Sequence, residues 1–220
     1  MTMEPILYPK KVALGAGIVG GIAGGTVMYG IMSTIMTQIG MGANCFAIIM
    51  GLITGQSYEN ALYPGIIAHF LTSIAIGVAF GAIINVKKLQ IQGFRKGIGL
   101  GIATGVIAFA VIFVPIAMTV LPPHMMDLMK MMPMRNMGPD NMKGNTMNEQ
   151  SSMSGSMQEK SAMDEKMKME EMNKMMMEET QKLFPMILAG AFVSHVAFGA
   201  ALGMVVTPIV KRASTKSSMR

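Results

Sequence analysis

The sequence predicts an all-α membrane protein with four transmembrane helices that form two repeated hairpins. Three observations support this fold class. Four apolar stretches are long enough to cross about 30 Å of hydrocarbon at about 1.5 Å per residue. Clusters of basic residues flank these stretches. The chain has 25 glycines in 220 residues, concentrated in the apolar runs, and glycine is commoner in transmembrane helices than in soluble ones.

The predicted spans divide the chain into three parts. Apolar residues make up 51% of the chain and the mean hydropathy is +0.47, which argues against a soluble globule. The spans are approximately Val12–Thr37, Ala61–Val86, Gly97–Leu121 and Phe184–Val210. A fifth apolar stretch, Ala43–Gly55, is too short to cross and is expected to form a re-entrant or interfacial helix. Residues 1–121 then hold three spans, 122–183 form a long loop, and 184–220 hold the fourth span and a basic tail.

The distribution of charge predicts the orientation in the membrane. Basic residues precede the first span, fill the second connection and follow the fourth span: Lys10, Lys11, Lys87, Lys88, Arg95, Lys96, Lys211, Arg212, Lys216 and Arg220. The first connection has no Lys or Arg. The positive-inside rule therefore places both termini and the second connection in the cytoplasm, with the spans in the cell membrane. The apolar spans predict the lipid bilayer as the environment. Because the charges are sorted by segment, the net charge of +6 does not indicate a nucleic-acid partner.

The loop between the third and fourth spans is extracytoplasmic in this topology and rich in methionine. It holds 18 of the 29 methionines, between Met125 and Met177, together with 8 basic and 10 acidic residues. Its first part is rich in Pro, Gly, Asn and Ser and is expected to be irregular. From about residue 156, Glu and Lys recur at i,i+4 spacing. This pattern predicts a helix that runs toward the fourth span and is interrupted near Pro185.

Internal similarity predicts the two hairpins. The segment Gly15–Gly21 resembles Gly99–Gly105 in its glycine spacing. The second and fourth spans carry two series with the same spacing: His69, Ser73, Gly77 and Gly81, and His195, Gly199, Gly203 and Thr207. Parallel repeats of this kind are related by an axis along the membrane normal. Glycine rows at i,i+4 spacing on the first and third spans are expected to pack closely against neighbouring helices.

One face of the first span carries candidate metal ligands. Met28, Met32 and Met36 follow one another at i,i+4 spacing, and His69 and His195 lie at a comparable depth in their own spans. Protonatable residues inside a membrane mark functional sites, and neutral imidazole with thioether suits Cu(I). The alternative is that the methionines fill gaps and each histidine bonds a backbone carbonyl or a neighbouring hydroxyl.

A second group of candidate ligands lies just outside the third span. Its members are one histidine and the methionines that follow it: His124, Met125, Met126, Met129, Met131, Met132 and Met134. The thioether is a soft, neutral ligand whose binding needs no loss of a proton, and soft sulfur ligands select Cu(I). The alternative is an unstructured insert that acts as a reversible sink for oxidants.

These motifs resemble those of the high-affinity copper-uptake transporters. The likeness consists of MxM and MxxM clusters outside the membrane, the intramembrane MxxxM of Met28 and Met32, and the glycine rows. In that family each chain has three spans, with the MxxxM on the second, whereas this chain has four apparent spans and its MxxxM is on the first. The resemblance therefore implies ligand chemistry and not membership of the family.

Two functions of different classes follow from the sequence. The leading hypothesis is a copper-handling protein that captures Cu(I) with loop methionines and passes it into the bundle or to a copper-protein partner. The alternative is an accessory subunit of a larger membrane complex, such as a copper-dependent oxidase or monooxygenase, without a metal site of its own. Either would be a homo-oligomer or bind other membrane subunits. The chain has no nucleophile–base pair, phosphate loop or intramembrane acid, so no catalytic residue and no enzyme activity are expected.

Overall fold

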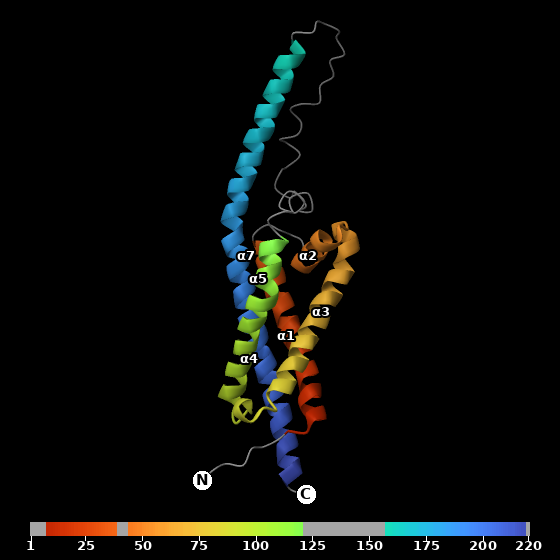
Figure 1. Ribbon diagram of the computed structural model, residues 1–220, viewed down its shortest axis with the longest axis vertical. Helices are drawn as coiled ribbons and strands as arrows, with labels where there is room; N and C mark the ends of the chain where they lie inside the picture. The colour runs from red at the N-terminus through yellow and green to blue at the C-terminus, as the bar shows by residue number, and fades with distance from the viewer. Residues whose placement is uncertain (1–7, 39–43, 121–156, 219–220) are drawn as a thin grey trace. The chain divides into compact units, whose positions relative to one another are not determined.

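The computed structural model describes residues 8–38, 44–120 and 157–218, and this part of the chain is helical without a strand (Figure 1). In chain order the α-helices are α1 (Lys10–Gln38), α2 (Cys45–Thr54), α3 (Tyr58–Ile83), α4 (Phe94–Ala108), α5 (Val114–Thr119) and α7 (Met157–Ser218). A 3-10 turn, η1 (Lys87–Leu89), follows α3, and a π-helical turn, η2 (Phe109–Phe113), joins α4 to α5. The predicted all-helical class is confirmed.

Four helical segments in the described residues are long and apolar enough to cross a membrane. They are Lys10–Gln38, Tyr58–Ile83, Phe94–Thr119 and Phe184–Ser214. Large apolar side chains on these segments point outward, among them Ile67, Leu71 and Val111, which are 58%, 62% and 67% exposed. Such surfaces are suited to lipid rather than water. The prediction of four helices with the length and composition to cross a membrane is confirmed.

The helix α7 continues through Pro185, where the sequence analysis places an interruption. It runs unbroken from Met157 to Ser218, over 62 residues, so that prediction is wrong. Proline lacks one backbone N–H and removes one hydrogen bond of the helix. In membrane-spanning helices neighbouring groups compensate for such a loss, and the flanking residues retain their own helical bonds.

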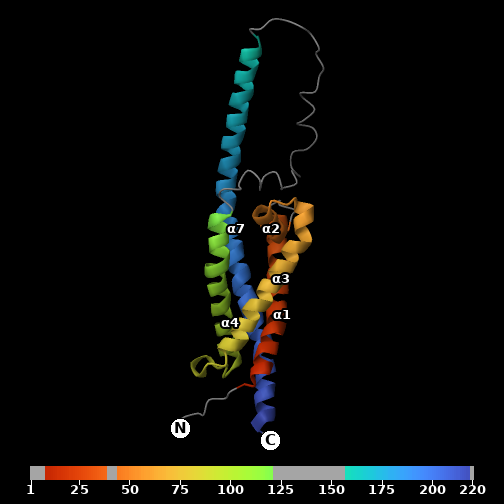
Figure 2. The same cartoon turned by 45° about the vertical axis from the view of Figure 1, so that its right-hand side comes forward.

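The chain divides into two compact units, Met1–Pro133 with Gly190–Arg220, and Met134–Ala189. Within the first unit, α1 begins, α3 ends, α4 begins and α7 ends at one end, whereas α2 lies at the other (Figures 1 and 2). Its core is formed by buried side chains from α1, α3, α7 and adjoining segments: Tyr8, Ala13, Ala16, Phe80, Ile84, Ile91, Phe198, Leu202, Val206 and Val210. At the end where α1 and α4 begin, the Tyr8 hydroxyl donates a hydrogen bond of 2.6 Å to the carbonyl oxygen of Ile91.

Helices α1 and α3 approach each other closely at small residues. A Cβ atom added to Gly17 would overlap the carbonyl oxygen of Gly77, and one added to Gly77 would overlap that of Gly17. One turn further along α1, a Cβ on Gly21 would meet the carbonyl oxygen of Ser73. The two backbones are therefore in direct contact, which is how helices gain packing energy in lipid.

Helices α4 and α7 meet in the same way. A Cβ on Gly101 would overlap the carbonyl oxygen of Gly199, and one on Gly203 would overlap that of Gly97. A Cβ on Gly105 would overlap the carbonyl oxygen of His195. The glycine rows of α1 and α4 thus pack against neighbouring helices, as their spacing predicts.

Candidate functional site

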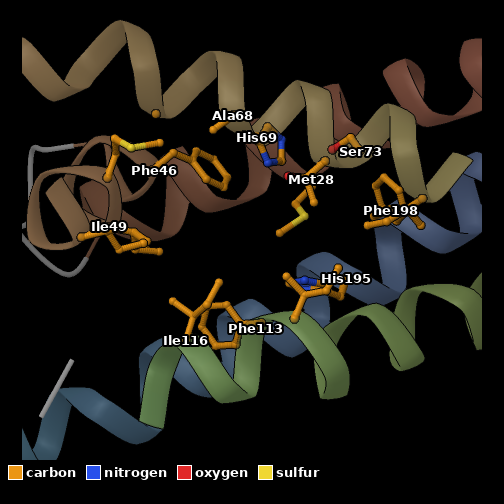
Figure 3. Close-up of a pocket in the computed structure, with 16 residues that line it drawn as sticks. Met28, Phe46, Ile49, Ala68, His69, Ser73, Phe113, Ile116, His195 and Phe198 are labelled. Carbon is orange, nitrogen blue, oxygen red and sulfur yellow. The ribbon is translucent and has the colours of Figure 1, made fainter. Parts of the chain in front are cut away.

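A cavity of about 200 Å³ lies inside the first unit. Three of the candidate ligands from the sequence line it together: Met28 from α1, His69 from α3 and His195 from α7. In Figure 3 the two histidines lie on opposite walls, and the side chain of Met28 extends between them. Most other lining residues are apolar, such as Ile116 and Phe198. The cavity therefore gathers a few ligand atoms in an otherwise apolar space.

His69 is held by a hydrogen bond between helices. Its ring is buried, and Nε2 lies 3.0 Å from the carbonyl oxygen of Gly25 on α1. A carbonyl oxygen only accepts hydrogen bonds, so Nε2 carries the proton. In the neutral ring Nδ1 then bears a lone pair, and it has no hydrogen-bond partner among the residues that the structure describes. That nitrogen is available as a metal ligand.

His195 is oriented within its own helix. Its Nδ1 donates a hydrogen bond of 2.7 Å to the carbonyl oxygen of Ala191, one turn earlier in α7. Its Nε2 therefore bears the lone pair, again without a hydrogen-bond partner in the described part of the chain. The rings of Phe109 and Phe113 flank the imidazole, with centroids 5.4 and 5.7 Å away. The backbone bonds foreseen as the alternative for both histidines do exist, yet each uses only one ring nitrogen.

The π-helical turn η2 places these aromatic rings. Pro115 follows the turn and has no N–H with which to bond the carbonyl of residue 111. The N–H of Val114 bonds the carbonyl oxygen of Phe109, five residues back, rather than the carbonyl four residues back as in a regular α-helix. Such turns insert one residue into a helix and often occur at functional sites. Phe109 and Phe113 of this turn both contact the His195 ring, and Phe113 also lines the cavity.

The short helix α2 packs against His69 through the ring of Phe46. The side chain of Asn44 caps α2 by accepting hydrogen bonds from the N–H groups of Phe46 and Ala47, at 2.9 and 3.3 Å. Its amide nitrogen donates to the Tyr29 hydroxyl on α1, at 2.9 Å. The ring of Phe46 stacks on the His69 imidazole with centroids 4.0 Å apart and an interplanar angle of 29°. One wall of the cavity is therefore an aromatic ring fixed by a capped helix.

The three methionines on one face of α1, Met28, Met32 and Met36, lie in two different environments. Met28 is partly buried and lines the cavity. Met32 and Met36 are each 4% exposed, but neither belongs to the cavity lining. One turn before Met28, a Cβ on Gly24 would contact Phe198 of α7, so this face of α1 packs toward α7. The structure thus brings one of the three predicted methionines to the histidines.

The second predicted group of ligands lies outside the described residues: His124, Met125, Met126, Met129, Met131, Met132 and Met134. Within the described residues, no three His, Cys, Asp or Glu side chains form a metal-binding group. The cavity also contains a residue that the sequence analysis missed, Met50 of α2. The helical spacing of Phe46, Ile49 and Met50 would have pointed to it.

Protein-family models, curated proteins and solved structures were all compared with this chain, and none of them matches it.

Proposed function

We propose that this protein binds Cu(I) inside its membrane bundle, at the cavity lined by Met28, His69 and His195. The observation that carries the proposal is the convergence of these three side chains from three helices. Two imidazoles, each with one nitrogen that has no hydrogen-bond partner among the described residues, form a soft and neutral ligand set together with one thioether. The apolar lining favours an ion with low charge, and Cu(I) coordinated by neutral ligands keeps a single positive charge.

The loop methionines supply the step before this site in our proposal. Their thioethers capture Cu(I) outside the membrane, and His124 with Met125, Met126 and Met129 holds it at the membrane edge. The ion then moves toward Met28, His69 and His195, or to a copper-protein partner. Capture can be tested on a peptide of residues 122–156 in competition with a Cu(I) chelator. An affinity no better than that of its Met→Leu version would eliminate the capture step.

The orientation follows from the basic residues. In our proposal both termini and the α3–α4 connection are cytoplasmic, and the Met-rich loop lies outside the cell membrane. It is supported by the arrangement of the first unit, in which the basic starts of α1 and α4 and the basic end of α7 share one end (Figures 1 and 2). The positive-inside rule then assigns that end to the cytoplasm.

We further propose that the two hairpins are repeats of one another. Supporting this, the close contacts follow the same order in both: Gly17 with Gly77 and Gly21 with Ser73 in the first hairpin, and Gly97 with Gly203 and Gly101 with Gly199 in the second. The next pair in each series contains the histidines, Gly25 with His69 and Gly105 with His195. Repetition of this kind supplies two imidazoles at one depth.

The binding proposal is tested by counting the Cu(I) equivalents that the full-length protein retains against a strong chelator. A triple variant with Met28→Leu, His69→Gln and His195→Gln should retain one equivalent fewer than the native chain. The matched control replaces Met32 and Met36 with leucine, because both are buried but do not line the cavity. Equal retention by the native chain and the triple variant would refute the intramembrane site.

The accessory-subunit hypothesis has one observation in its favour. Gly15, Gly30 and Gly99 lie on helices of the bundle, and a Cβ on any of them would meet nothing within 4 Å. Small residues left open on a membrane helix allow another helix to approach closely. Purification in mild detergent separates the two functions. A stoichiometric complex with other membrane subunits would favour this hypothesis, whereas a homo-oligomer that retains copper would favour the first.

A further inference from the structure

Helix α2 presents one of its faces to the cavity. Phe46, Ile49, Met50 and Ile53 all belong to the cavity lining, and positions i, i+3, i+4 and i+7 share one side of a helix. Met50 is the member of this face that carries a metal-binding atom. Its sulfur is of the same kind as that of Met28, which lines the same cavity from α1.

The stacking of Phe46 on His69 determines how close Met50 lies to the site. The two rings are 4.0 Å apart between centroids. Met50 follows Phe46 by one turn, so their Cβ atoms are separated by about 5–6 Å. The methionine side chain has three rotatable bonds and adapts to irregular space. Met50 therefore lines the same cavity as His69, one helical turn from the ring that stacks on the imidazole.

Contacts at its N-terminal end hold α2 in this position. At its start, Asn44 caps the helix, and the backbone N–H of Asn44 donates a hydrogen bond of 2.9 Å to the Tyr58 hydroxyl. A Cβ on Gly65 of α3 would overlap the carbonyl oxygen of Phe46, so the two backbones touch there. At its end, Gly55 has a φ of 70° and stops the helix. These features determine the position of α2 and therefore of Met50.

We propose that Met50 is a fourth soft ligand of the cavity, so that Cu(I) is bound by two imidazole nitrogens and two thioether sulfurs. The inference rests on the proposed function, since it adds a ligand to the same site. The ligand atoms are His69 Nδ1, His195 Nε2 and the sulfurs of Met28 and Met50. All four are neutral and soft, and such a set favours Cu(I) and its analogue Ag(I) over Zn²⁺ or Mg²⁺.

The test follows individual side chains in the full-length chain, because the loop methionines also bind soft metals in our proposal. The protein, with ¹⁵N-labelled histidine and ¹³C-methyl methionine, is placed in lipid nanodiscs and titrated with Ag(I). The chain has only 3 histidines, so single substitutions assign their ring signals, and Met50→Leu assigns the Met50 methyl. The Met50 methyl should shift at the same Ag(I) concentration as the rings of His69 and His195.

The Met50→Leu variant should need about tenfold more Ag(I) to shift the two histidine rings by half. Met32→Leu is the matched control, since Met32 is buried without lining the cavity, and it should leave that concentration unchanged. An unmoved Met50 methyl while the histidines shift would overturn the inference, as would equal effects of the two substitutions. Histidine rings that do not respond to Ag(I) at all would instead refute the proposed function.

Discussion

His69 on α3 donates a hydrogen bond from Nε2 to the carbonyl oxygen of Gly25 on α1, over 3.0 Å. This single contact joins two spans and also selects the ring nitrogen that remains free. His195 differs, because it bonds the carbonyl of Ala191 within its own helix. The two histidines of the cavity therefore differ in their contribution to the stability of the bundle.

His69→Phe should destabilise the bundle, since the ring volume is kept while a bond between helices is lost. The expected loss is about 1 kcal/mol in the free energy of unfolding, measured by titration with SDS. His195→Phe is the control, because its lost bond does not join two helices. Equal losses in the two variants would contradict a role of His69 in joining α1 to α3.

Gly17→Ala should destabilise α1–α3 packing, because its Cβ would overlap the carbonyl oxygen of Gly77. Overpacking of this kind costs about 1–3 kcal/mol. Gly15→Ala is the matched control on the same helix, where a Cβ meets nothing within 4 Å. Thermal unfolding in detergent should separate the two variants, and similar melting temperatures would show that the close approach has no energetic importance.

Asn44→Ala should loosen the N-terminus of α2. It removes a cap worth about 1 kcal/mol and the hydrogen bond to Tyr29. Hydrogen exchange at the amides of Phe46 and Ala47 should become faster. Thr54→Ala serves as the comparison, because the Thr54 hydroxyl bonds only the carbonyl of Met50 on the exposed side. Unchanged exchange in Asn44→Ala would mean that packing alone holds α2.

Cys45 should resist thiol reagents in the folded protein. It is buried, and burial raises the pKa of its thiol to about 12. The reactive thiolate therefore forms only well above neutral pH. Maleimide labelling near neutral pH should be slow until SDS unfolds the chain. Labelling as fast as that of an exposed cysteine introduced by Ser57→Cys would show that α2 opens readily.

Labelling also tests the orientation of the chain. In a Cys45→Ala background, Ser57→Cys should react with an impermeant maleimide on intact cells, because the proposed topology places the α2–α3 connection outside. Gln92→Cys, in the connection before α4, should react only after the cells are permeabilised. Both positions are exposed, so access to the reagent decides the result. The reverse pattern would invert the proposed topology.

The fold class could be predicted because hydropathy and helix length determine the number of spans almost directly. Span depth also suggested that Met28, His69 and His195 lie at one level. The role of α2 could not be predicted in the same way. It depends on contacts between distant residues, such as Asn44 with Tyr29 and Gly65 with the Phe46 backbone. Hydrophobic periodicity within one helix contains no information on such contacts.

The continuity of α7 at Pro185 was mispredicted for a related reason. A proline weakens a helix locally, but whether the helix ends there depends on the rest of the chain. Pro115 shows the other outcome, because it adjoins the π-helical turn η2. Sequence alone does not separate a proline that leaves a helix regular from one that accompanies an inserted residue.

The π-helical turn η2 has a consequence for how the third span tolerates insertions and deletions. It contains one residue more than a regular α-helical turn, and each residue of an α-helix rotates the following part by about 100°. Because the wide turn absorbs that residue, deletion of one residue in Phe109–Phe113 should restore a regular helix and leave Ile116 of α5 on the same wall of the cavity. A deletion within η2 should therefore preserve this wall of the cavity, whereas a deletion in the regular part of α4 should rotate the wall by about 100°.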